Sequence, residues 1–173
     1  MADINNSLAS RQPRSAESPV VDLIELLFFA YRDFISDPDA ILAKSSFGRA
    51  HHRVLHFVHR YPGLKVADLL DVLRITKQSL GRVLKQLLDE GYIIQKTGNN
   101  DRRQRLLYAT PKGEALVAKL AGLQTDRITS ALRDINPEGV AVISQFLRAM
   151  IDRDDPDKVL EAIFGIGSKK PRE

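Results

Sequence analysis

Apolar residues follow a helical spacing in the first part of the chain, after a polar stretch at residues 1–17. Ser18 and Pro19 supply a capping residue and a first-turn proline, a pairing typical of a helix start. The apolar stripe that follows contains Val20, Ile24, Leu27, Phe28, Tyr31 and Ile35. We expect this helix to end at Ser36-Asp37-Pro38.

A capping residue followed by proline recurs at three later places. These are Thr110-Pro111, Asn136-Pro137 and Asp155-Pro156. Each predicts a helix start. The first opens a long helix with apolar residues in register from Leu116 to Ile135, and the second a helix carrying Val140 to Met150. A short last helix is expected to carry Val159, Leu160, Ile163 and Phe164.

The centre of the chain changes its period. Three helices are predicted at Phe47–Tyr61, Val66–Val72 and Thr76–Glu90. Two strands follow at Tyr92–Thr97 and Gln104–Ala109, joined by turn chemistry at Gly98-Asn99-Asn100-Asp101. Three helices and a hairpin in this order predict a winged helix-turn-helix.

The fold predicted from this order is mainly α with a small β-hairpin wing. A winged helix-turn-helix module at 44–110 is flanked by a helical dimerisation region at 18–43 and 111–165. Residues 1–17 are expected to form a disordered arm, and residues 166–173 a flexible tail.

Charge separates the centre from the ends. Residues 44–112 hold 14 lysines and arginines against 5 acids, a net +9, whereas the rest of the 173 residues holds 12 against 17, a net −5. A basic centre is the electrostatic footprint of a protein that binds a polyanion. The chain has no cysteine, which excludes disulfides and thiolate metal sites and fits a cytoplasmic protein. Neither a signal peptide nor a membrane span is expected.

The helix at Thr76–Glu90 has two distinct faces. Its buried side is predicted to hold Leu80, Val83, Leu84 and Leu87. The opposite side holds Lys77, Gln78, Gly81, Arg82, Lys85 and Gln86, with no acid before Asp89. In a major groove, Arg or Lys pairs with guanine and Gln with adenine, while Thr76 and Ser79 either cap the helix or hold a phosphate. The alternative is an ordinary polar surface helix, but such faces usually mix both signs of charge.

The hairpin adds a second basic surface. Its tip and flanks carry Lys96, Asn99, Asn100, Arg102, Arg103 and Arg105. Such a hairpin can follow the DNA backbone and place an arginine in a narrow minor groove. We expect Asp101 to orient Arg103. A solvated loop with a local ion pair is the alternative.

The stretch from Leu64 to Gly113 resembles the multiple antibiotic resistance regulators, the MarR family. The resemblance rests on LLDVLRITKQSLGRVLKQLLDEGYI, on DRR at 101–103 and on TPKG at 110–113. It implies an obligate homodimer whose N- and C-terminal helices interlock, with Arg103 in the minor groove and Asp101 as its support. It also implies a recognition helix bearing Lys77, Gln78, Ser79 and Arg82. Gly81 departs from the hydroxyl residue that many members carry there, and the lack of cysteine excludes the thiol switch of the family's peroxide sensors.

All four histidines lie in one segment, at positions 51, 52, 56 and 59. His51 falls on the apolar face of the expected helix, whereas His52, His56 and His59 lie on a polar flank beside Arg53. Three interpretations stay open: an inert polar face, a pocket for a small anionic effector, or a metal, haem or proton sensor. No third ligand for a metal is identified.

The residues carry no sign of catalysis, because no nucleophile beside a base, phosphate-binding glycine loop or useful carboxylate pair is present. The sequence predicts a homodimeric transcription regulator, a repressor, that binds a pseudo-palindromic operator in double-stranded DNA without a cofactor. A small anionic effector is a further candidate partner. The alternatives are a non-enzymatic metal, haem or pH sensor, or a protein-interaction module with weak DNA binding.

Overall fold

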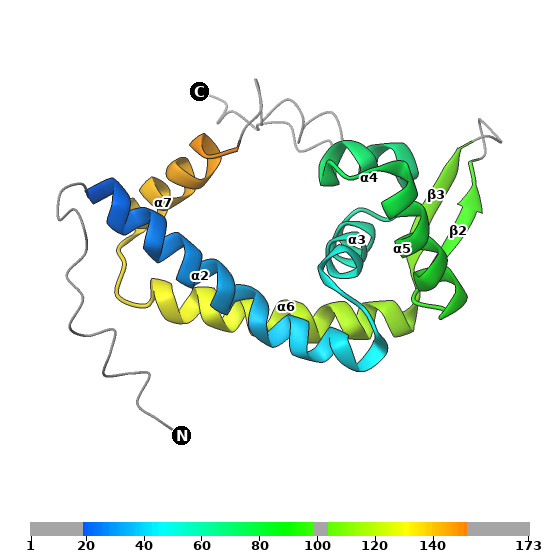
Figure 1. Ribbon diagram of the computed structural model, residues 1–173, viewed down its shortest axis with the longest axis horizontal. Coiled ribbons are helices and arrows are strands. Elements are labelled where there is room, and N and C mark those ends of the chain that lie inside the picture. The colour runs from blue at the N-terminus through cyan, green and yellow to red at the C-terminus, as the bar shows by residue number, and fades with distance from the viewer. Residues whose placement is uncertain (1–18, 99–103, 152–173) are drawn as a thin grey trace, which may run out of the picture. The chain divides into compact units, whose positions relative to one another are not determined.

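The computed structural model describes residues 19–98 and 104–151. The chain divides into two units, Met1–Ser36 and Asp37–Glu173. The described elements are α2 (Pro19–Leu42), the 3-10 helix η1 (Ala43–Ser45), α3 (Arg49–Arg60), β1 (Leu64–Lys65), α4 (Val66–Leu73), α5 (Lys77–Asp89), β2 (Ile93–Thr97), β3 (Arg105–Ala109), α6 (Pro111–Leu132) and α7 (Pro137–Ala149) (Figure 1). The predicted fold, mainly α with a winged helix-turn-helix between flanking helices, is confirmed.

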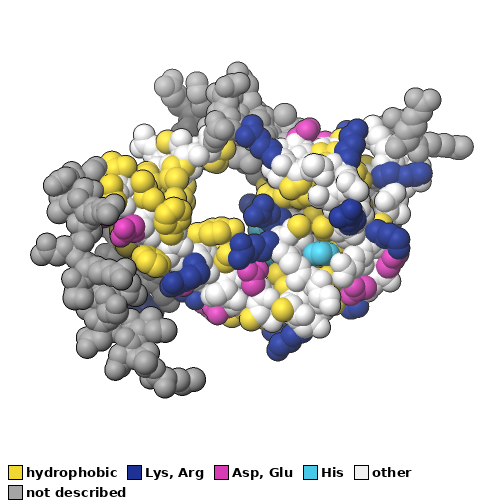
Figure 2. Space-filling view, in the orientation of Figure 1, with side chains coloured by type: hydrophobic (Ala, Val, Ile, Leu, Met, Phe, Trp, Pro, Cys, Tyr) yellow, Lys and Arg dark blue, Asp and Glu magenta, His cyan; other side chains and the backbone are white. Residues whose placement is uncertain are grey.

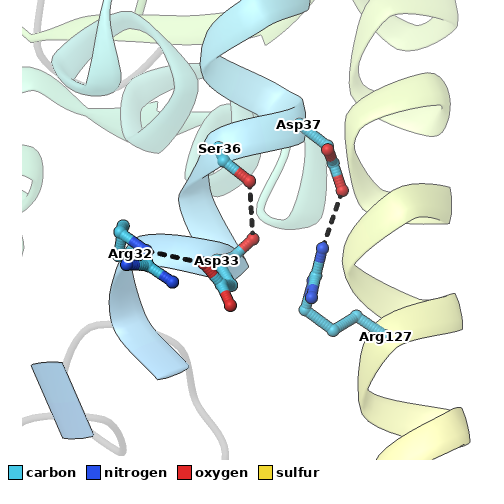
Figure 3. Close-up of polar contacts among 5 residues, drawn as sticks. All are labelled: Arg32, Asp33, Ser36, Asp37 and Arg127. Carbon is cyan, nitrogen blue, oxygen red and sulfur yellow. Dashed lines mark hydrogen bonds and ion pairs between the residues drawn. The ribbon is translucent and has the colours of Figure 1, made fainter. Parts of the chain in front are cut away.

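Helix α2 continues past the proline that was expected to stop it, so the predicted end at residues 36–38 is wrong. Pro38 lies inside the helix and is fully buried, and Leu42, one turn later, is only 1 % exposed. Burial of these apolar side chains offsets the backbone hydrogen bond that proline removes. Asp37 points toward Arg127 of α6, with 2.9 Å between Oδ2 and Nη2 (Figure 3). Tertiary contacts therefore override the local preference.

The sheet has three antiparallel strands in the order β1-β3-β2. The hairpin strands β2 and β3 confirm the two predicted strands, each beginning one residue later than expected, and pair Gln95 with Leu107. Strand β1 pairs Leu64 with Leu107, and both side chains are buried. The sequence did not predict β1, because two residues are too few to show an alternating pattern.

Helices α3, α4 and α5, the sheet and the first half of α6 share one apolar core; together we call them the winged module. Its fully buried side chains include Leu55 and Val58 of α3, Leu69 of α4, Leu80 and Leu87 of α5, Ile93 and Leu107 of the sheet, and Leu120 of α6. Because the first half of α6 is part of this core, its second half extends from the module as a continuous helix.

Two helices expose their apolar side chains. On α2 these are Val20, Val21, Leu23, Ile24, Leu26, Leu27, Phe28, Phe29 and Tyr31. On α7 and just after it they are Val142, Ile143, Phe146, Leu147, Met150 and Ile151. Figure 2 shows hydrophobic side chains gathered over both helices. Exposed apolar surface on this scale marks a site of association.

Several predictions fall outside the described residues: the arm at 1–17, the helix expected from Val159 to Phe164, and the tail at 166–173. Within the described ranges, no helix combines the length and the apolar character that crossing a membrane requires.

Candidate nucleic-acid interface

Helix α5 begins at a side-chain cap. Thr76 has extended backbone just before the helix, and its Oγ1 accepts a hydrogen bond from the backbone N–H of Ser79 at 3.1 Å. The Thr76 hydroxyl donates in turn to Ser79 Oγ at 3.0 Å. Of the two roles predicted for this pair, capping is therefore the one that the structure contains.

The two faces of α5 differ as the pattern predicts. Leu80, Val83, Leu84 and Leu87 are at most 7 % exposed, which confirms the predicted buried side. The opposite side, which we call the basic face of α5, exposes Lys77, Gln78, Gly81, Arg82 and Lys85 to solvent. Lys and Arg side chains gather over α5 in Figure 2. The basic face therefore offers cations and an amide with no negative charge among them.

The acids of this segment stand at the C-terminal end of α5. Asp89 pairs with Lys85 one turn earlier, and Glu90 accepts a hydrogen bond from Gln86 Nε2 at 3.1 Å. Exposed pairs of this kind contribute little to stability. Both negative charges lie at the C-terminal end of α5. Lys77, Gln78 and Arg82 lie on the first two turns, away from these acids.

Gln86 is held from a second side by His51 of α3. The backbone N–H of Gly48 donates to His51 Nδ1 at 3.1 Å, so this nitrogen has no proton and the neutral ring carries its proton on Nε2. His51 Nε2 then donates to Gln86 Oε1 at 2.9 Å. The ring also stacks on Phe47, with centroids 4.7 Å apart. Gln86, predicted on the DNA-facing side, is half-buried and has both its polar atoms engaged within the protein.

The junction between α5, β2 and α6 is closed by the Thr-Pro-Lys-Gly segment. Thr110 Oγ1 donates to the carbonyl of Gly91 at 2.7 Å and caps α6 by accepting from the Gly113 N–H at 3.1 Å. Lys112 Nζ donates to the carbonyl of Glu90 at 2.8 Å and lies 4.1 Å from the centre of the Tyr92 ring. Sequence reasoning predicted a helix start here but not the role of Lys112, because its partners are about 20 residues away along the chain.

The flanks of the wing carry two of the predicted DNA-binding residues. Lys96 Nζ lies 4.9 Å from the centre of the Tyr108 ring, and Arg105 Nη1 donates to Thr97 Oγ1 at 3.2 Å across the hairpin. Both cations are exposed. The predicted tip residues Asn99, Asn100, Asp101, Arg102 and Arg103 lie outside the described residues.

The four residues predicted to bind an effector all lie on α3, but they differ in exposure. His52 is half-buried, whereas Arg53, His56 and His59 are exposed. In the described part of the chain, no group of three or more His, Cys, Asp or Glu side chains is arranged to hold a metal ion.

Burial changes the acidity of two of these histidines. Partial burial lowers the pKa of His52, the neighbouring His56 lowers it further, and Asp39 acts in the opposite direction. Burial also lowers the pKa of His56, together with the positive charge of Arg60. Because the His56 side chain is exposed, desolvation counts for less there than at His52. The fold therefore favours the neutral form of His52.

Known proteins are similar to this chain both in sequence and in fold. Residues 45–104 match the model of the MarR family. The chain is 48 % identical over 129 residues to the HTH-type transcriptional regulator PetP of Rhodobacter capsulatus. The matched region covers 75 % of this chain and 78 % of PetP.

The fold resembles solved structures at lower identity. Streptococcus pneumoniae FabT in complex with DNA has a TM-score of 0.65 at 18 % identity, over 74 % of this chain and 92 % of that one. A putative MarR family regulator from Listeria monocytogenes complexed with a 26mer DNA has a TM-score of 0.65 at 19 % identity, over 80 % and 92 %. With the motifs from Leu64 to Gly113 and the winged fold in agreement, the chain belongs to the MarR family.

Proposed function

We propose that this protein is a homodimeric transcriptional repressor that binds a pseudo-palindromic operator through α5 and the wing. One observation carries the proposal: the basic face of α5 is exposed from Lys77 to Lys85 without an acid. The relative PetP is named a transcriptional regulator, and the two similar folds were solved with DNA, which supports the same ligand here.

The residues of α5 and the wing divide by the part of DNA they contact. Lys77, Gln78 and Arg82 lie exposed on the first two turns of α5 and reach base edges in the major groove. Lys96 and Arg105 face the phosphate backbone from the wing. Arg103, oriented by Asp101, occupies the minor groove and responds to its width.

The second copy covers the exposed apolar surfaces of α2 and α7. Both surfaces present large side chains, such as Phe28 and Phe146, that a soluble monomer rarely leaves in water. A two-fold dimer presents two α5 helices, so the operator has half-sites about 34 Å apart, one turn of DNA.

The test uses the full chain and two DNA duplexes. A duplex enriched by the wild-type protein from a randomised pool serves as the operator, and a scrambled version of it is the reference. Arg82→Ala should weaken operator binding by about 1–3 kcal/mol and change scrambled binding much less, because the lost contact reads a base. Lys119→Ala, which removes an exposed cation of α6, is the matched control and should bind as the wild type does.

The same titrations at several salt concentrations test the wing. Arg103→Ala should weaken binding to both duplexes and reduce the slope of log affinity against log salt by about one. Asp101→Ala should reproduce part of the affinity loss without the change in slope. If the wild-type protein enriched no sequence from the pool, sequence-specific regulation would be ruled out.

A further inference from the structure

Gly81 occupies the interior of α5, where glycine is less favourable than alanine because it has more backbone freedom to lose. Other glycines of this chain have a reason within the structure. Gly63 and Gly91 have φ values of 86° and 73°, which other residues rarely adopt. At Gly113, an added Cβ would lie 2.1 Å from the carbonyl oxygen of Tyr92.

None of these reasons applies to Gly81. Its backbone is helical, and an added Cβ would meet nothing within 4 Å. The described residues therefore contain no contact that requires glycine at this position.

A Cβ added at Gly122, inside α6, would also meet nothing within 4 Å. The open space around Gly81 therefore does not by itself distinguish it from Gly122. The surroundings differ. Gly122 is half-buried and lies one turn from Lys119 and Asp126, charges of opposite sign. Gly81 is exposed in the middle of the basic face, one turn from Lys77 and Lys85.

Gly81 exposes the helix backbone to solvent among neighbours that have long polar side chains. Gln78 lies three residues before it and Arg82 follows it, and both are exposed. A partner that meets Lys77, Gln78 and Lys85 together therefore meets the helix backbone at Gly81.

We infer that Gly81 is a specificity-determining position, at which the backbone of α5 closes against base edges on the floor of the major groove. This rests on the proposed function. Without a Cβ, the helix sits deeper in the groove, and the shorter side chain Gln78 reaches a base edge alongside Arg82. A methyl group at position 81 holds the helix away from the floor and weakens both contacts. Contacts to phosphates, which lie at the rim of the groove, are preserved.

The experiment compares Gly81→Ala with Gly122→Ala in the full chain. Both variants should unfold at higher urea concentration than the wild type at the same protein concentration, because alanine favours a helix. On the enriched duplex, Gly81→Ala should lose about tenfold in affinity, within the range expected for one base contact. On the scrambled duplex it should bind within about twofold of the wild type, because phosphate contacts dominate there. Gly122→Ala should bind both duplexes as the wild type does, because Gly122 lies on α6, outside the basic face of α5 and outside the apolar surfaces of α2 and α7 that the second copy covers.

Each other result decides against the inference. Wild-type affinity of Gly81→Ala for the enriched duplex would show that nothing lies close to the backbone there. An equal loss on both duplexes would place a phosphate, not a base edge, against Gly81. If the wild-type protein itself did not distinguish the duplexes, the proposed function would fail and this inference with it.

Discussion

The winged module and the helices α2 and α7 use apolar residues in opposite ways. In the winged module, side chains such as Leu55, Leu87 and Leu107 are entirely buried within one chain. On α2 and α7, side chains as large as Phe28 and Phe146 are 68 % and 46 % exposed. The winged module therefore folds on contacts within one chain, whereas α2 and α7 expose apolar surface that the proposed second copy would bury.

The buried polar atoms of side chains are also satisfied by contacts within one chain. Across the described residues, no buried side-chain nitrogen or oxygen lacks a hydrogen-bond partner. The caps at Thr76 and Thr110 and the His51–Gln86 contact each join two elements or fix a helix start. The module therefore presents the basic face of α5 from a fixed frame, whereas in the proposed dimer the orientation of the two modules depends on how the copies associate.

Charged substitutions in the apolar surfaces of α2 and α7 should dissociate the proposed dimer and weaken DNA binding more than any other change. Phe28→Asp combined with Phe146→Asp places carboxylates in surfaces that the second copy should bury without a partner charge. The wild-type protein should sediment as a dimer at micromolar concentration and the double variant as a monomer. Affinity for the enriched duplex should fall by about 100-fold or more, because the two half-sites are no longer bound by linked modules.

Ile94→Asp is the control, because Ile94 is an exposed apolar residue of β2, outside both surfaces. This variant should remain a dimer. A wild-type protein that sediments as a monomer, or a double variant that stays dimeric, would show that α2 and α7 are not covered by a second copy.

Long periodic elements were predictable from the sequence, and contacts across the chain were not. The buried side of α5 followed from four apolar residues at helical spacing, so its exposed side followed as well. The predicted helix end before Pro38 failed because burial of that proline outweighs its local preference. The link from His51 to Gln86 spans 35 residues, and no periodicity reports such a distance.

The His51–Gln86 contact lies inside the winged module, so its loss should affect the stability of the module. His51→Ala removes the acceptor for the Gly48 N–H and the donor to Gln86, and should lower the free energy of unfolding by about 1–2 kcal/mol. His51→Gln retains an acceptor at the helix start and should lose less. Urea titrations at fixed protein concentration measure both.

His59→Ala is the matched control on the same helix, since His59 is exposed. A surface substitution there should change stability by no more than about 0.5 kcal/mol. Equal losses for the variants at 51 and 59 would mean that the hydrogen bonds of His51 add nothing beyond an ordinary surface contact.

His52 should give the free energy of unfolding a modest dependence on pH, weaker than the effects above. Because partial burial lowers its pKa in the folded state, the unfolded chain takes up the proton first as the pH falls below about 6.5. Stability should therefore be highest at neutral pH and decline through the window between the unfolded pKa and the lower folded one. His52→Gln cannot titrate, so its free energy of unfolding should decline less between about pH 7.5 and about pH 5.5. If His52→Gln declined as steeply as the wild type, the fold would not discriminate between the two protonation states of His52, and the polar flank of α3 would be as open to water as the basic face of α5.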